Sequence, residues 1–200
     1  MSGRPAYGSG RERLLDAATA SIRRKGFAAT GIDELCAQAG VSKGSFFHHF
    51  ASKEDLGIAV AERWAEVGKA LAVGLGGRTA RERVLAYIDL RAALIEGGTD
   101  EFTCLAGTLA QEVHQSHPRL RDAAANAIEV TAASIEGDVA AALRDAGRRQ
   151  VSPGSLSLYI QTVLQGAFVV AKAKADPAPA HDALAHLKRY VTTLVTRKKP

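Results

Sequence analysis

The 200-residue sequence is poor in cysteine, proline and aromatic residues, with two Cys, six Pro and only 6% Phe, Trp and Tyr. Two cysteines cannot form the disulfide framework of a small secreted domain, and their separation fits no metal-binding spacing. No apolar run approaches the roughly 18 residues of a membrane-spanning helix, and the first ten residues lack the apolar stretch of a secretory signal. We therefore expect a protein of the reducing cytoplasm.

Residues that favour β-strands are also scarce, whereas alanine is abundant. The hydrophobic share of 46% and the charged share of 24% are those of a folded chain rather than a disordered one. Alanine favours helix by intrinsic propensity, so the composition predicts an all-α fold. The sequence contains no glycine-rich phosphate loop, nucleophile elbow or zinc-protease helix, so nothing in it indicates an enzyme, a cofactor or a metal.

Apolar periodicity and breaks at Gly and Pro divide the chain into about nine helices and no strand. Residues 1–9 are expected to be a flexible arm, 10–55 a compact helical domain, and 56–200 a second helical domain. The predicted helices are Arg11 to Lys25, Thr30 to Ala39, Lys43 to Phe50, Ser52 to Val73, Thr79 to Glu96, Thr103 to Gln115, Pro118 to Gly147, Ser155 to Ala175 and His181 to Arg197.

The segment from Thr30 to Phe50 carries the clearest motif. Thr30 is a suitable N-cap, with Asp33 three residues later, and Gly40 ends the short helix. Ser42 is a second N-cap and begins another short helix. Two short helices joined by such a tight turn predict a helix-turn-helix, in which the second helix lies in the DNA major groove.

On a helical wheel, Phe46 and Phe50 share the inward face of this second helix. The outward face carries Gly44, Ser45 and His48, with Phe47 beside them, and has no large aliphatic side chain. A glycine permits close backbone approach, and the polar side chains can bond base edges or phosphates. An ordinary helical hairpin with a solvated polar face is the alternative from this pattern alone.

The stretch GFAATGIDELCAQAGVSKGSFFHHFASKEDL closely resembles the DNA-binding domain of TetR-type transcriptional regulators. The resemblance implies that Thr30 caps its helix and touches a phosphate. The sequence departs from the family at one position. Phe47 stands where members usually carry Tyr, so one hydroxyl that would contact a phosphate is missing. The DNA-contacting residues that the resemblance implies are Thr30, Ser42, Lys43, Gly44, Ser45, Phe47, His48 and Lys53.

The resemblance further implies a homodimer and a small-molecule effector bound in the C-terminal domain. The last two long helices carry the apolar stripes that a dimeric four-helix bundle needs, although the same stripes would also suit the core of a single subunit. The expected interface residues are Val163, Ala167, Val170, Leu184, Leu187, Val191 and Leu194. The expected pocket residues, which combine bulk and polarity, are Trp64, Phe102, Cys104, Leu105, Leu109, Glu112, Tyr159, Gln165 and Phe168.

Two further sites in the second domain are hypotheses. Cys104 is expected in the first turn of a helix, where the helix dipole favours a thiolate that could sense an electrophile, although Asp100 and Glu101 oppose ionisation. A small residue without chemistry is the alternative. Glu112, His114 and His117 crowd one helix end, but the sequence places no third or fourth metal ligand, so we expect no metal site.

The net charge of +5 is spread over both domains, with nine Lys and Arg against seven acids in residues 1–64. It is therefore weak evidence for DNA binding. The placement of Lys43, Lys53, Arg4, Arg11 and Arg13 is more informative, because these residues flank the two helices expected near phosphates. We predict a dimeric repressor that an effector releases from a near-palindromic operator; an all-helical enzyme or carrier, and an activator or architectural DNA-binding protein, are the alternatives.

Overall fold

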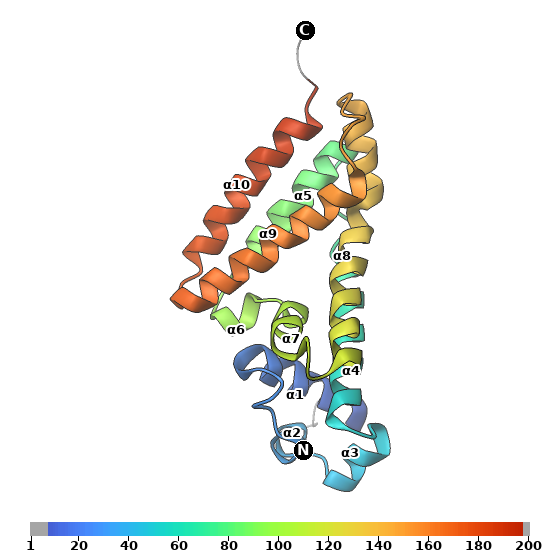
Figure 1. The fold of residues 1–200 in the computed structure, drawn as a ribbon, viewed down its shortest axis with the longest axis vertical. Helices are drawn as coiled ribbons and strands as arrows, with labels where there is room; N and C mark the ends of the chain where they lie inside the picture. Colours follow the sequence, from blue (N-terminus) through green and yellow to red (C-terminus); the bar gives the residue numbers. More distant parts are fainter. Residues whose placement is uncertain (1–7, 198–200) are drawn as a thin grey trace, which may run out of the picture. The chain divides into compact units, whose positions relative to one another are not determined.

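The computed structural model describes residues 8–197, which contain ten helices and no strand (Figure 1). The predicted all-α fold is confirmed. The helices are α1 (Gly10–Lys25), α2 (Ile32–Ala39), α3 (Lys43–His49), α4 (Lys53–Ala70), α5 (Ala80–Ala93), α6 (Thr99–Phe102), α7 (Leu105–Val113), α8 (Pro118–Asp145), α9 (Pro153–Lys174) and α10 (Ala178–Val195). The expected arm lies mostly outside the described residues.

The tenth helix is α6, which lies between the predicted helices Thr79 to Glu96 and Thr103 to Gln115, so the second of these corresponds to α7 alone. The short α6 ends at Phe102, and Thr103 takes an extended conformation with ψ of 155° before α7 begins. Cys104 therefore precedes α7 instead of lying in its first turn. The predicted N-cap Ser42 is confirmed, Thr79 caps α5, and Pro118 opens α8 as expected.

The helices form two compact units, and neither is a single stretch of chain. The first contains residues 8–64 and 105–126, and the second contains residues 65–104 and 127–197. Both α4 and α8 contribute residues to each unit. A cut of the sequence at one position therefore cannot separate the units.

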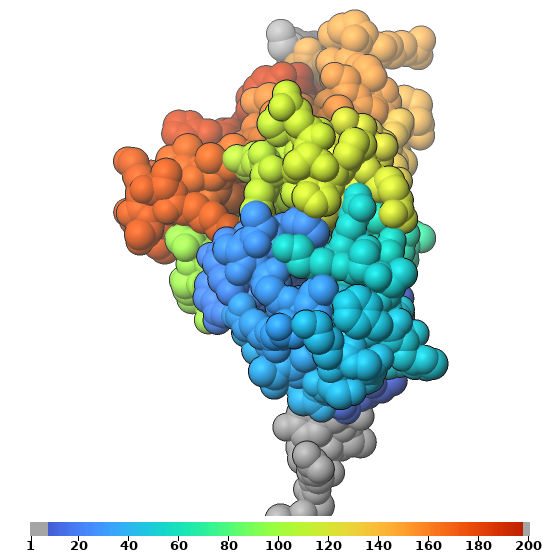
Figure 2. All heavy atoms as spheres, turned by 60° about the horizontal axis from the view of Figure 1, so that its bottom comes forward, coloured from blue at the N-terminus to red at the C-terminus, as the bar shows by residue number. Residues whose placement is uncertain are grey.

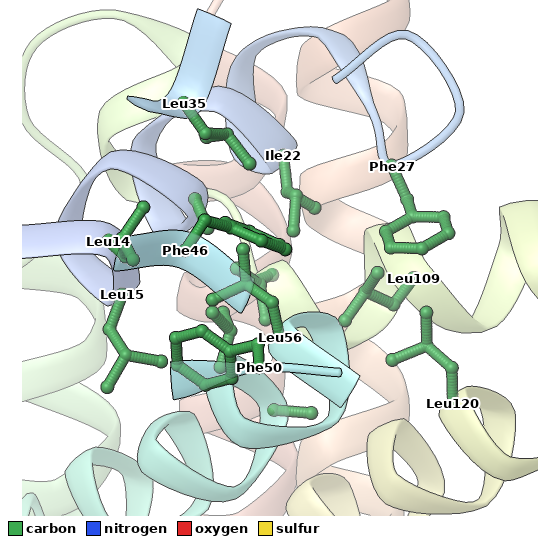
Figure 3. Close-up of a cluster of buried hydrophobic side chains, with 14 of the residues drawn as sticks. Leu14, Leu15, Ile22, Phe27, Leu35, Phe46, Phe50, Leu56, Leu109 and Leu120 are labelled. Atoms are coloured by element: carbon green, nitrogen blue, oxygen red, sulfur yellow. The ribbon is translucent and has the colours of Figure 1, made fainter. Parts of the chain in front are cut away.

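The core of the first unit is built from side chains of α1 to α4 together with α7 and α8. Leu14 and Phe46 are fully buried, and Leu109 of α7 and Leu120 of α8 lie in the same cluster (Figure 3). Burial of such side chains stabilises each by about 1.5–3 kcal/mol. The α7–α8 hairpin is thus an integral part of the unit that holds the helix-turn-helix.

The core of the second unit lies where α9 packs against α10 and where α10 packs against α5. Helix α9 is also the described helix whose length and apolar composition would suffice to cross a membrane. Its inward face is buried by other helices, as in the core helix of a soluble protein. The buried residues of α9 are Leu156, Ser157, Ile160, Gln161, Leu164, Ala167, Phe168 and Ala171.

Candidate nucleic-acid interface

A tight turn joins α2 to α3 and sets the geometry of the motif. Gly40 ends α2 in the left-handed conformation, with φ of 61°, which a residue with a Cβ rarely adopts. Two residues later the Ser42 hydroxyl accepts a hydrogen bond from the Ser45 N–H at 3.1 Å and begins α3. The turn therefore brings the two helices together as the sequence predicted.

The inward face of α3 is held by aromatic packing. Phe46 is fully buried and Phe50 is 5% exposed, and their ring centroids lie 6.0 Å apart. Both side chains belong to the core cluster in Figure 3. A helix of seven residues is marginal by itself, so these two anchors, rather than helix propensity, hold α3 in place.

The outward face of α3 is open to solvent and lies within the blue to cyan surface in Figure 2. Lys43, Gly44, Phe47 and His48 are all exposed, and the Phe47 ring is 49% exposed. A Cβ at Gly44 would meet only the Ser42 hydroxyl oxygen, at 3.8 Å. Nothing inside the described chain therefore requires a glycine here. Ser45 is half-buried at the edge of this face.

Lys43 is joined to α2 by an ion pair. Its ammonium lies 2.8 Å from the Asp33 carboxylate, and this hydrogen bond raises the pKa of Lys43. Both side chains are largely exposed, so the pair is screened by solvent and has little effect on stability. Lys43 is thus a permanent positive charge at the N-terminal end of α3.

The expectation for Thr30 is wrong. Gly31, not Thr30, is the N-cap of α2, and no side chain caps this helix. The Thr30 side chain is buried; its hydroxyl donates to the carbonyl of Gly26 at 2.7 Å and is hydrogen-bonded to the Ser21 hydroxyl at 3.2 Å. A hydroxyl that is turned into the core cannot reach a phosphate in this conformation.

Lys53 and Arg13 are also engaged within the first unit. The Lys53 ammonium donates to the carbonyl oxygens of Phe27 and Thr30, both at 3.1 Å, and lies 4.4 Å from the centre of the Phe27 ring. The Arg13 Nε donates to the Ala39 carbonyl at 2.8 Å. These two cations position backbone segments around the motif. Arg4 lies outside the described residues.

Glu112 of α7 holds the same loop from the other side. Its two carboxylate oxygens accept hydrogen bonds from the backbone N–H groups of Phe27, at 2.6 Å, and of Ala28, at 2.8 Å. The His117 ring packs edge-on against Phe27. Glu112 is therefore a positioning residue for the loop before α2, and both of its carboxylate oxygens are engaged there rather than in the expected pocket.

Most of the other expected pocket residues do not come together. Leu105 and Leu109 are fully buried in the core of the first unit, where Trp64 also packs, under the guanidinium of Arg23. Tyr159 is 44% exposed on α9, and Gln165 is only partly buried. Phe102 and Phe168 are the pair that meets, with ring centroids 6.0 Å apart in the second unit, and Cys104 is buried beside α7.

The second unit contains a buried polar cluster that was not predicted from the sequence. The Tyr87 hydroxyl accepts hydrogen bonds from Gln161 Nε2 at 2.9 Å and from Arg91 at 3.1 Å. Ser157, one turn before Gln161, is 1% exposed, and its hydroxyl has no hydrogen-bond partner. The Arg91 guanidinium also lies 6.0 Å from the centre of the Phe168 ring. Tyr87 and Arg91 are four residues apart on α5, as are Ser157 and Gln161 on α9, so each pair shares one face of its helix. This spacing is the signal in the sequence that could have revealed the cluster.

The residues predicted to form the dimer interface lie on two different faces of α9 and α10. Leu184, Leu187 and Val191 of α10 are buried within the subunit, as is Ala167 of α9, so the prediction that they meet a second chain is wrong. The solvent-facing side of these helices is also apolar. It carries Leu158, Tyr159, Val169, Val170 and Tyr190, each 43–47% exposed, with Val163 and Leu194 partly buried beside them.

A short exposed helix, fixed by aromatic anchors and joined to its partner helix by a tight turn, defines a helix-turn-helix protein with a second helical unit. Comparison with known proteins narrows this class. Residues 14–60 match the model of bacterial regulatory proteins of the tetR family, and residues 80–187 match the tetracyclin repressor-like C-terminal domain. The chain belongs to the TetR family and is a DNA-binding transcriptional regulator, not an enzyme.

Relatives and solved structures agree along nearly the whole chain. The HTH-type transcriptional repressor NemR of Escherichia coli K12 is 31% identical over 192 residues, which is 92% of this chain and 94% of NemR. The crystal structure of reduced E. coli NemR superposes with a TM-score of 0.78 at 27% identity, over 91% of this chain and 97% of that one. A TetR regulator from Chloroflexus aurantiacus gives 0.79 at 29% identity, over 92% and 94%.

Proposed function

We propose that this protein is a homodimeric repressor of the cytoplasm that binds a near-palindromic operator and leaves it when a small molecule binds the second unit. The observation that carries the proposal is the exposed face of α3 on its buried aromatic anchors. The name and the similarity of the repressor NemR support the sign of regulation.

The α3 face suits the major groove in its chemistry. Gly44 lets the backbone approach closely, while the exposed Phe47 ring offers apolar contact to a thymine methyl group. His48 and Ser45 are the candidates for bonds to base edges or phosphates, and Lys43 and the capped N-terminus, with Ser42, suit a phosphate. Thr30 and Lys53 contribute indirectly, because both hold the loop before α2.

The proposed dimer uses the solvent-facing side of α9 and α10. Tyr159 and Tyr190 lie next to each other, with ring centroids 5.5 Å apart, so the exposed residues of the two helices form one continuous apolar surface. An apolar surface of this kind is typical of an interface between subunits. Two such pairs of helices would form a four-helix bundle, and the two-fold axis of the dimer would match that of the operator.

The proposed effector site is the polar cluster around Tyr87 and Gln161. Ser157 and Arg91 add a hydroxyl and a cation, and Phe102 and Phe168 add apolar wall. Few polar groups among apolar walls are typical of small-molecule sites. An effector that binds one arrangement of the dimer more tightly by a few kcal/mol would release the operator.

The decisive experiment selects genomic DNA fragments that the purified protein binds and then measures affinity for one of them as salt rises. A specific complex should lose affinity with a slope of about −0.9 in log K against log salt for each neutralised phosphate. Metabolites made or consumed by the neighbouring gene products are then tested for release. A flat salt response, or no enriched fragment, would overturn the proposal; higher expression of the neighbouring genes in the presence of the protein would show an activator.

A further inference from the structure

A hollow lies where α8 passes into α9, within the second unit. It has a volume of about 320 Å³ and is open to solvent on one side. Its lining combines apolar and cationic side chains, namely Ala140, Leu143, Arg144, Arg148, Arg149, Val151 and Pro153. A volume of this size accommodates a small organic molecule. None of these residues belongs to the candidate DNA-binding face, the apolar face or the Tyr87 cluster.

The three arginines of the hollow lack acidic partners, unlike several other arginines of the described chain. Arg63 and Arg119 pair with Asp16 and Asp55, and Arg83 pairs with Asp138 at 2.6 Å. Among residues 8–197, no carboxylate lies within ion-pair distance of Arg144, Arg148 or Arg149. Their positive charges are therefore uncompensated at short range.

Arg148 is the most constrained of the three. One of its terminal nitrogens donates to the carbonyl of Thr193 on α10 at 3.2 Å, and its Nε is buried without a hydrogen-bond partner. A buried donor without a partner is costly, so this guanidinium is not fully satisfied by the chain itself. Arg81 adds a further cation at this end of α10, because its Nε donates to the Thr196 hydroxyl at 3.2 Å.

The acidic residues nearby do not fill the hollow. The side chain of Glu136 on α8 reaches the first turn of α9. Its carboxylate oxygen would lie 3.3 Å from a Cβ added at Gly154, so this carboxylate already complements the dipole of α9. Asp145 follows Arg144 in sequence and is exposed.

We propose that this hollow binds a small phosphate-bearing anion with more than one negative charge. The planar guanidinium presents paired N–H donors that match the oxygens of a phosphate, and three arginines together favour a polyanion over a monoanion. The apolar lining from Leu143, Val151 and Pro153 accommodates the uncharged part of such a molecule. This site is separate from the proposed effector cluster, and its existence does not depend on the proposed operator binding.

The test uses the full chain and inorganic pyrophosphate, titrated by calorimetry at fixed ionic strength. We expect saturable binding that the double variant Arg144→Gln/Arg149→Gln weakens at least about tenfold, because two charge-assisted contacts are lost. Lys174→Gln removes one charge from an exposed residue elsewhere in the second unit and should leave the affinity unchanged. Lys43→Gln should also leave it unchanged, which separates this site from phosphate contacts at α3.

Three results would overturn the proposal. These are the absence of saturable binding, equal affinity in the wild type and the double variant, and loss of binding in Lys43→Gln alone. Citrate, titrated in parallel, distinguishes the ligand class, since tighter binding of the tricarboxylate than of pyrophosphate would contradict the phosphate assignment. Thermal unfolding of each variant verifies that the double substitution leaves the fold intact, because both side chains are exposed.

Discussion

Glu112 and Phe27 are 85 residues apart in sequence and are joined by a 2.6 Å hydrogen bond from the Phe27 N–H to the Glu112 carboxylate. The loop after α1 is held by this carboxylate on one side and by the Lys53 ammonium on the other. The loop leads directly into α2, and α2 braces α3. The orientation of α3, the proposed DNA-reading helix, therefore depends in part on a residue of α7.

Replacing Glu112 by alanine should weaken both stability and operator affinity. The variant leaves two backbone N–H groups without their acceptor, which costs about 1–3 kcal/mol in the free energy of unfolding. The loop before α2 then loses its anchor, so operator affinity should fall as well. Thermal unfolding and DNA-binding titrations measure the two effects. Glu96→Ala is the control, because Glu96 is exposed; equal behaviour of the two variants would rule out the positioning role.

Replacing Gly44 by alanine should separate stability from DNA binding. Alanine favours a helix interior by about 1 kcal/mol over glycine, and the added Cβ meets no close neighbour. We therefore expect unchanged or higher stability together with operator affinity lowered about tenfold by a clash with DNA. Gly137→Ala, on the exposed side of α8, gives the same helix benefit and should retain full affinity. Wild-type affinity in the Gly44 variant would contradict the assignment of α3.

The proposed dimer interface on the apolar face of α9 and α10 can be tested by substitution. Val170→Asp puts a charge into the proposed interface, where an unpaired charge is strongly unfavourable, so sedimentation velocity should show a monomer. Val73→Asp makes the same change at a valine that is 77% exposed elsewhere, and it should remain dimeric. Leu184→Ala, by contrast, should lower the free energy of unfolding by about 2–5 kcal/mol as a core cavity. A dimeric Val170→Asp protein would exclude this face.

Acid should destabilise the first unit through Asp55. Hydrogen bonds from Ser52 and Arg119 hold the pKa of this carboxyl below its ordinary value of 3.8, so the folded state binds fewer protons than the unfolded state near that pH. The resulting stability is present above the ordinary pKa and is lost as the pH falls through the lowered one. Asp55→Asn should therefore show a shallower loss of melting temperature between about pH 5 and 3. Parallel curves would exclude the contribution.

Local features of the motif were predictable because their signals lie within a few residues. Ser42 and Phe46 are examples, since capping needs a neighbour three residues away and the inward face follows helical periodicity. The prediction for Thr30 was wrong because a hydroxyl beside a helix start can cap it or turn inward, and here it turns inward to the Gly26 carbonyl and Ser21. The two outcomes carry the same local sequence signal, so the sequence alone could not separate them.

Long-range features could not be predicted, because the groups that they join are far apart in the sequence. The stripe of Leu184, Leu187 and Val191 shows that α10 has an apolar face, but periodicity does not say whether that face meets its own subunit or another. Glu112 gave no signal because its acceptor role depends on backbone groups 84 and 85 residues away. Sequence patterns therefore predicted the helices of the motif better than the surfaces around them.

Ser157 provides the sharpest test of the polar cluster in the second unit. Its buried hydroxyl has no hydrogen-bond partner. Ser157→Ala should therefore leave the free energy of unfolding unchanged or raise it by about 1 kcal/mol. Ser134→Ala is the matched control, because the Ser134 hydroxyl donates to the Thr131 carbonyl at 2.7 Å, and its removal should cost about 1 kcal/mol. If the Ser157 hydroxyl is reserved for an effector, Ser157→Ala should also require more effector for operator release at unchanged operator affinity. Equal destabilisation in both variants, with an unchanged effector response, would exclude that role.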